Sequence, residues 1–175
     1  MLSLAPKTPP RGFSLIELII AIAIISVVVA IAMPGYATWV KNSRVRTAAE
    51  SIQNGLQTAR AEAIKRNLAV KFVLASHSAW CITTSNCTTA SDTLQSRTAS
   101  EGSSSAISVT TAPSDSTEVE FNNLGSVSAS PVPFSQVDLN LTGADRPLRV
   151  TLGVGGNTRL CDPSSKLKPD DPRRC

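Results

Sequence analysis

The sequence predicts an α+β fold in which one long N-terminal helix packs against an antiparallel β-sheet in the C-terminal domain. Three observations predict this fold. An apolar run extends from Phe13 to Met33, apolar residues then recur at helical spacing, and apolar and polar residues alternate from Leu68 onward. We therefore expect an N-terminal helix over residues 13–67 and a globular β domain over residues 68–175.

The apolar run is long enough to cross a membrane. At about 1.5 Å per residue, a helix over residues 13–33 spans about 31 Å, close to the thickness of a bilayer's hydrocarbon core. We therefore expect a single membrane span at about 13–33. Glu17 lies inside this run. A carboxylate there costs about 3 kcal/mol on insertion, so we expect it to have a cationic partner.

Two other interpretations fit part of the N-terminus. A secretory signal peptide accounts for the basic residues Lys7 and Arg11 and for a small-x-small cleavage site at Ala30–Ala32, although the apolar run is longer than usual. A plain single-pass anchor accounts for the length alone. Basic residues flank the apolar run on both sides, so the positive-inside rule does not predict which end of the span is cytoplasmic.

The helix beyond Pro34 is predicted to be amphipathic. Glu62 and Arg66 form an i,i+4 pair on its polar side, while Gly55 and Pro34 are weak points. The apolar residues recur at steps of three and four and should form a face packed on the globular domain: Val45, Ala48, Ala49, Ile52, Leu56, Ala59, Ala63 and Ile64.

Alternation of apolar and polar residues predicts short strands in the C-terminal domain. The Ser/Thr-rich region 75–117 has little apolar content, and we expect long loops with weak strands there. Gly153–Gly156 lacks the lysine and helix of a phosphate loop, which favours a hairpin turn. The clearest alternating segments are 70–74, 118–121, 137–141 and 148–152.

The four cysteines, Cys81, Cys87, Cys161 and Cys175, allow three disulfide pairings. They form no metal-binding motif, and His77 is the only histidine, so we expect no metal site. Spacing favours Cys81–Cys87 and Cys161–Cys175 in an oxidising compartment. The second bond would close a loop of about 15 residues, which is worth about 3 kcal/mol in the chain-entropy model.

Charge is unevenly distributed along the chain. The net charge is +5 over residues 41–71 (seven basic, two acidic), −6 over 72–145 (one basic, seven acidic) and +4 over 146–175 (seven basic, three acidic). This segregation indicates distinct electrostatic ends. No serine lies in a nucleophile elbow and no histidine cluster is possible, so we expect neither an enzyme nor a cofactor.

Arg11–Leu18, RGFSLIEL, resembles the prepilin signature of type IV pilins and type II secretion pseudopilins. The resemblance implies that residues 1–12 are a leader, which a prepilin peptidase removes by cutting after Gly12. It also implies that the new amino terminus, Phe13, is methylated. In this family the glutamate at the position of Glu17 is thought to pair with the amine of a neighbouring subunit, which sets the register of assembly.

The helix end, Leu56–Asn67, resembles that of H-type pseudopilins and FimT/FimU-type minor pilins, and the Cys161-Asp162-Pro163 turn is similar to FimU-like proteins. The resemblance implies a pilin fold and a minor pilin that takes part in type IV pilus assembly or priming. Such a subunit is inserted once in the bacterial inner membrane, with its C-terminal domain in the periplasm, before it enters the filament. Its implied partners are other minor and major pilins and the inner-membrane assembly platform; an H-type pseudopilin of type II secretion is the alternative.

A second alternative is a DNA-binding minor pilin for DNA uptake. Five basic residues near the C-terminus offer phosphate contacts: Arg159, Lys166, Lys168, Arg173 and Arg174. DNA-binding FimT-like proteins carry a Gly-Arg-x-Arg string, whereas Gly156–Arg159 here has a single arginine. No aromatic residue follows Phe134, so no base-stacking residue is present near the tail. Assembly is therefore favoured over DNA binding.

Overall fold

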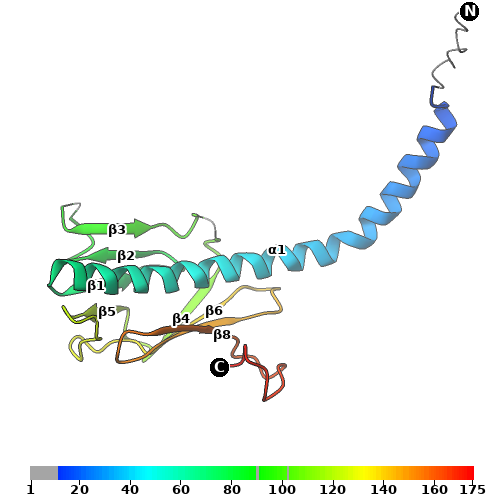
Figure 1. The fold of residues 1–175 in the computed structure, drawn as a ribbon. Helices are drawn as coiled ribbons and strands as arrows, with labels where there is room; N and C mark the ends of the chain where they lie inside the picture. Colours follow the sequence, from blue (N-terminus) through cyan, green and yellow to red (C-terminus); the bar gives the residue numbers. More distant parts are fainter. Residues whose placement is uncertain (1–11, 90, 102) are drawn as a thin grey trace, which may run out of the picture. The chain divides into compact units, whose positions relative to one another are not determined.

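The computed structural model describes residues 12–89, 91–101 and 103–175. Most of the predicted leader, residues 1–11, lies outside the described residues. The chain divides into two compact units within its long helix, between Ala37 and Thr38. Figure 1 shows the globular unit, which begins at Thr38, with most of its strands labelled.

The helix α1 runs from Leu15 to Arg66 with Pro34 inside it. At its start the Ser14 carbonyl accepts hydrogen bonds from the amides of Glu17 and Leu18, at 3.1 and 3.2 Å. The acidic Glu17 in the first turn and the basic Lys65 and Arg66 in the last complement the helix dipole. Asn67 ends the helix with a positive φ of 54°, and the Leu68 amide bonds the Ala63 carbonyl, as in a C-terminal cap.

The N-terminal half of α1 has an apolar surface on all sides. An 18-residue window near its start has a mean hydropathy of 3.0 and none of it is buried. Among the described residues, α1 is the one helix long and apolar enough to cross a membrane by length and composition. Its large side chains, Leu15 to Met33, are all exposed in the isolated chain. A surface of this kind requires lipid or other apolar helices around it.

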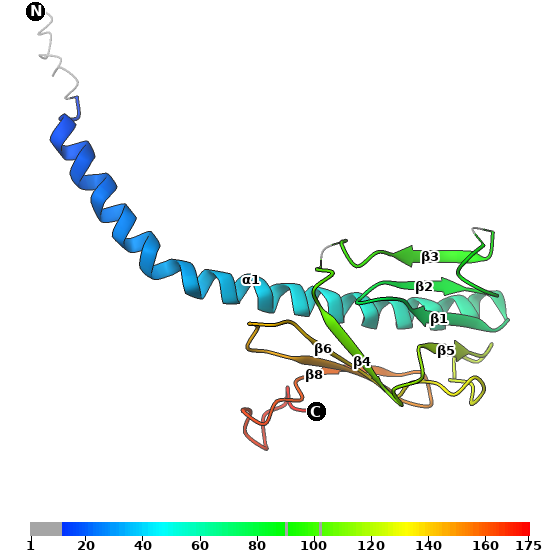
Figure 2. The ribbon, with the colours of Figure 1, turned by 180° about the vertical axis from the view of Figure 1, so that it is seen from behind.

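Within the described residues of the globular unit, eight strands form two four-stranded antiparallel sheets (Figures 1 and 2). The first sheet has the order β3-β2-β1-β5 and the second the order β4-β6-β7-β8. This confirms the predicted α+β class, although two sheets replace the single one expected. The strands are β1 Val70–Leu74, β2 Trp80–Thr83, β3 Thr93–Arg97, β4 Ser108–Ala112, β5 Glu118–Phe121, β6 Gln136–Asn140, β7 Leu148–Leu152 and β8 Thr158–Cys161.

The apolar face of α1 and both sheets share one hydrophobic core. Seven of the eight predicted face residues are fully buried, from Val45 to Ala63. Ile64 is the exception: its side chain is 51% exposed. It lies in the last turn of the helix, near the loop at Gly125. The apolar face therefore ends one residue earlier than the spacing predicts.

The Ser/Thr-rich region holds three strands, β2, β3 and β4. All four residues of β2 are buried, so it shows no alternation. Strands β3 and β4 each lie at one edge of their sheet and are hydrogen-bonded to one neighbour. No residue of either strand is fully buried, so these segments need few apolar side chains.

Two small residues, Ser51 and Gly55, let α1 approach the first sheet closely. The Trp80 indole Nε1 donates a hydrogen bond to Ser51 Oγ at 2.9 Å, and both side chains are buried. A β-carbon added at Gly55 would lie 2.7 Å from Cε2 of Phe72, whose ring is fully buried. The sequence marks Gly55 as a weak point of the helix; in the fold it is the position where Phe72 and Trp80 contact the helix backbone.

The predicted hairpin turn is confirmed between β7 and β8. The Gly153 amide bonds the Asn157 carbonyl at 2.9 Å, and Gly156 has a φ of 77°. Gly156 also contacts the carbonyl of Gly125, which lies in the loop after β5. Positive φ and the lack of space for a β-carbon both require glycine at Gly156.

Candidate assembly site and C-terminal tail

The residues of the prepilin signature lie at the start of α1. Gly12 and Phe13 precede the helix, and Glu17 occupies its first turn. The Phe13 side chain is 88% exposed, and no heavy atom lies within 4 Å of a β-carbon placed at Gly12. The scissile bond expected between these residues is therefore accessible, while Glu17 lies on the apolar half of the helix. Within the described residues, the structure places all three in one short segment.

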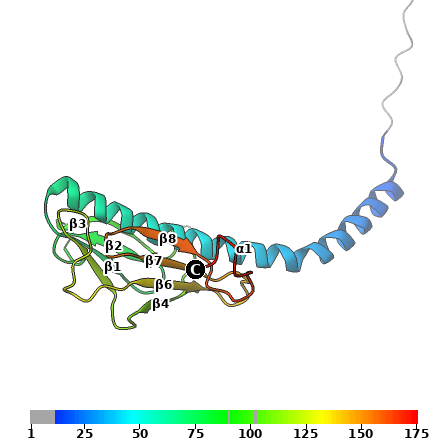
Figure 3. The ribbon, with the colours of Figure 1, turned by 60° about the horizontal axis from the view of Figure 1, so that its bottom comes forward.

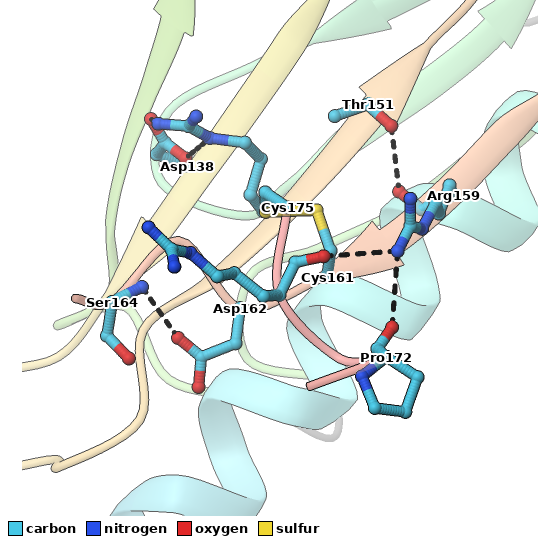
Figure 4. The surroundings of a disulfide bond; sticks show 10 residues. Asp138, Thr151, Arg159, Cys161, Asp162, Ser164, Pro172 and Cys175 are labelled. Atoms are coloured by element: carbon cyan, nitrogen blue, oxygen red, sulfur yellow. Dashed lines mark hydrogen bonds and ion pairs between the residues drawn. A yellow bond between two sulfur atoms is a disulfide. The ribbon is translucent and has the colours of Figure 1, made fainter. Parts of the chain in front are cut away.

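The tail after β8 folds back on that strand (Figure 4). The structure pairs Cys161 with Cys175, with their Cα atoms 5.0 Å apart. The Asp162 amide bonds the Arg173 carbonyl at 2.7 Å, and the Cys175 amide bonds the Asp162 carbonyl at 3.2 Å. The Asp162 carboxylate accepts a further hydrogen bond from the Ser164 amide. Backbone bonds thus accompany the disulfide in ordering a segment rich in proline and charge.

The five candidate DNA-binding residues differ in what they contact. Arg159 donates to the carbonyls of Pro172 and Arg174 at 3.2 and 3.1 Å, which fastens the tail to β8 (Figure 4). Arg173 forms an ion pair with Asp171 at 2.6 Å, and its guanidinium lowers the pKa of that carboxyl to about 2. Lys166, Lys168 and Arg174 have exposed side chains. Two of the five cations are therefore already engaged within the tail.

The other predicted disulfide, Cys81–Cys87, lies at the first sheet. The structure pairs Cys81 of β2 with Cys87 in the following turn, and their Cα atoms are 6.3 Å apart. Both Cα separations fall in the range that disulfides adopt. In the described part of the chain, no three His, Cys, Asp or Glu side chains gather in a way that could hold a metal ion.

Peptide mapping without reduction should link Cys81 to Cys87 and Cys161 to Cys175 in protein taken from an oxidising compartment. We expect this result because each pair lies within disulfide distance in the folded chain, whereas the two pairs belong to different sheets. Peptides that cross-link Cys81 or Cys87 to Cys161 or Cys175 would contradict the prediction. The same digest after reduction serves as the control.

Arg60 connects α1 to two loops of the globular unit, a role that the sequence of the helix end does not predict. Its Nε donates to the Gly125 carbonyl at 3.0 Å, and its side chain also contacts Gly156. It thereby fastens the loop after β5 and the β7–β8 hairpin to α1. By contrast, Glu62 and Arg66 pair at 2.6 Å on the exposed side, as their spacing predicts. The partners of Arg60 are about 65 and 96 residues away in the chain, so no local sequence pattern predicts these contacts.

Comparison with known proteins agrees with the architecture. The family model of the type II transport protein GspH matches residues 48–156, and that of the prokaryotic N-terminal methylation motif matches residues 9–33. Two crystal structures of the type IV minor pilin FimU from Pseudomonas aeruginosa are similar, with TM-scores of 0.52 and 0.53 and identities of 16% and 15%. The matches cover 66% of this chain and 90% and 87% of the FimU chains. The chain therefore belongs to the GspH family, carries the N-terminal methylation motif of pilin-like proteins and shares the fold of the minor pilin FimU.

Proposed function

We propose that the chain is a minor pilin that takes part in type IV pilus assembly or priming as a structural subunit. One observation carries the proposal. The N-terminal half of α1 is apolar and exposed on all sides around Glu17, whereas the C-terminal half is packed into its own domain. The first half needs lipid around it before assembly and neighbouring helices of the same kind afterwards.

The route to the filament follows from this division of the helix. Residues 13–33 hold the chain in the inner membrane as a single span, with residues 68–175 in the periplasm. A prepilin peptidase removes residues 1–12 and methylates Phe13. The subunit then leaves the bilayer for the filament through the assembly platform and contacts other minor and major pilins.

Cleavage supplies the cationic partner that Glu17 requires. Hydrolysis of the Gly12–Phe13 bond leaves an ammonium group on Phe13, and methylation keeps its charge. In the apolar centre of a filament, the attraction between this group and Glu17 of an adjacent subunit offsets the desolvation of both. A pair of this kind forms at one axial offset between subunits, so Glu17 sets the register.

The mature protein should begin at N-methylated Phe13, and intact mass spectrometry of the membrane-bound form tests this. A Gly12→Leu variant should retain its leader, because a bulky side chain replaces the residue at the cut. The accessible position of Gly12 makes a folding defect in this variant unexpected. A mature chain that starts at Met33 would contradict the proposal and support a secretory signal peptide.

A second candidate function is that of an H-type pseudopilin in type II secretion. The match to the GspH family model favours it. Deletion of the gene in its host separates the two functions. Loss of surface pili with normal protein secretion supports the minor pilin, whereas loss of secretion with normal pili supports the pseudopilin.

The full-length protein in detergent should bind duplex DNA weakly at physiological salt. Arg159 and Arg173 are engaged within the tail, which leaves three cations, Lys166, Lys168 and Arg174, for phosphates and gives a shallow salt dependence. A gel-shift titration at two salt concentrations measures this, with a Lys166→Gln/Lys168→Gln variant for comparison. Submicromolar binding that this variant abolishes would make DNA capture the better assignment.

A further inference from the structure

The globular unit has two ends that the helix defines. Near its N-terminal end, the Asn42 side chain accepts hydrogen bonds from the Asp145 and Arg146 amides, at 2.9 and 3.3 Å, in the turn between β6 and β7. Cys161 pairs with Arg149 near the same turn, so the tail begins there too. Figures 1 and 2 show the β6–β7 turn and the tail at the same end of the unit.

Arg60 marks the opposite end. It binds Gly125 and contacts the β7–β8 hairpin. Asn42 and Arg60 are separated by about 27 Å at the usual helix rise. The view in Figure 3 shows β8 running between the two ends and leading into the tail. Charges at the Asn42 end are therefore well separated from those at the Arg60 end.

Positive charge collects at the Asn42 end. The segments at this end, 41–50, 142–146 and 159–174, also contain five acidic residues: Glu50, Asp145, Asp162, Asp170 and Asp171. Two of them, Glu50 and Asp171, are paired with Arg46 and Arg173. The exposed cations outnumber the acids, and the Lys41 ammonium lies over Gly143 in the β6–β7 turn. We call the remaining cations the basic end: Lys41, Arg44, Arg146, Lys166, Lys168 and Arg174.

The basic end directly follows the membrane span in the chain. Only seven residues, 34–40, separate Met33 from Lys41 in the chain. Trp39 lies between them and is 63% exposed, and tryptophan is typical of the headgroup region. Basic residues that directly follow a membrane span are attracted to an anionic leaflet, by about 1 kcal/mol for each Lys or Arg near the surface.

We propose that the basic end binds the phosphate groups of anionic phospholipids in the leaflet where the membrane span ends. The contact holds the domain against the bilayer before the subunit enters a filament. Lipid fits better than DNA because Lys41 and Arg44 follow the membrane span directly in the chain, which favours contact with headgroups over contact with a duplex. The inference rests on the membrane anchor of the proposed function and adds a ligand to it.

Hydrogen exchange of the full-length protein in lipid nanodiscs tests the proposal. We compare nanodiscs of phosphatidylcholine with nanodiscs that also contain phosphatidylglycerol, and follow amides 142–146 and 164–174. With the anionic lipid, exchange in both segments should slow by about fivefold for each cation that engages, and high salt should remove the effect. Recovery of the protein with the nanodiscs checks the anchor separately.

Two matched variants locate the effect. Lys166→Gln/Lys168→Gln should reduce the lipid-dependent slowing, whereas Lys65→Gln/Lys71→Gln, which removes two charges at the Arg60 end, should leave it unchanged. Equal exchange in both kinds of nanodisc would overturn the proposal. Slowing in phosphatidylcholine nanodiscs on addition of duplex DNA, with none from phosphatidylglycerol, would overturn it in favour of DNA binding.

Discussion

A Glu17→Ala variant should be inserted into the membrane and processed, and yet be nearly absent from filaments. Removal of the carboxylate makes insertion easier. In the filament, however, it leaves the Phe13 ammonium of a neighbouring subunit buried without a partner. Breaking a buried ion pair on one side costs about 3–5 kcal/mol, so incorporation should fall by about a hundredfold or more. Quantitative immunoblotting of sheared filaments and of membranes measures the two pools.

Ser26→Ala provides the matched control for Glu17→Ala. Ser26 is a polar residue in the same apolar segment, but its hydroxyl already bonds the Ile22 carbonyl at 2.7 Å within the helix. This variant should enter filaments normally. If Glu17→Ala enters them as well as Ser26→Ala does, the carboxylate does not set the register of assembly.

A Gly55→Ala variant should lose about 1–3 kcal/mol of unfolding free energy, although alanine is the better helix former. The new β-carbon would lie 2.7 Å from a carbon of the buried Phe72 ring and 3.1 Å from Trp80. Neither ring has room to retreat, because Phe72 is fully buried and Trp80 is fixed by its bond to Ser51. Gly55→Leu should prevent native packing of α1 on the first sheet. Denaturant unfolding of the full-length protein in detergent, followed by tryptophan fluorescence, gives both values.

Gly35→Ala is the control, since a β-carbon at Gly35 has no heavy atom within 4 Å. This substitution changes helix propensity alone and should leave stability unchanged or raise it by up to about 1 kcal/mol. A loss of stability equal to that of Gly55→Ala would contradict the packing argument. A gain at both positions would do so too, because it would show that the Phe72 ring moves aside freely.

The parts of the fold that the sequence predicts are those with a repeated local pattern. The helix face from Val45 to Ala63 repeats at helical spacing, and the strands β1, β5, β6 and β7 alternate regularly. Each forms as predicted, except that β6 begins and ends one residue earlier. In the region 75–117, where weak strands are expected, the pattern does not locate them. All residues of β2 are buried, and no residue of β3 or β4 is fully buried, so none of the three shows a regular alternation of buried and exposed positions. Their positions depend on partners elsewhere in the chain.

The site residues, too, can be predicted from the sequence only where they form a local motif. The residues Gly12, Phe13 and Glu17 form a local motif, which sequence reasoning can recognise without a structure. Ser51 and Arg60 do not: a buried serine and an arginine that binds a distant carbonyl look like ordinary polar helix residues. Their function depends on Trp80 and Gly125, which only the folded chain brings close.

The contacts along the second half of α1 have a mechanical consequence. Asn42, Ser51, Gln57 and Arg60 each hydrogen-bond a different strand or loop, and the Phe72 ring fits against the backbone at Gly55. A force that pulls the helix along its axis must shear these contacts together, and the aromatic ring blocks axial sliding. Tension applied to the helix is therefore transmitted to both sheets at once, and the domain travels with its helix rather than slipping along it.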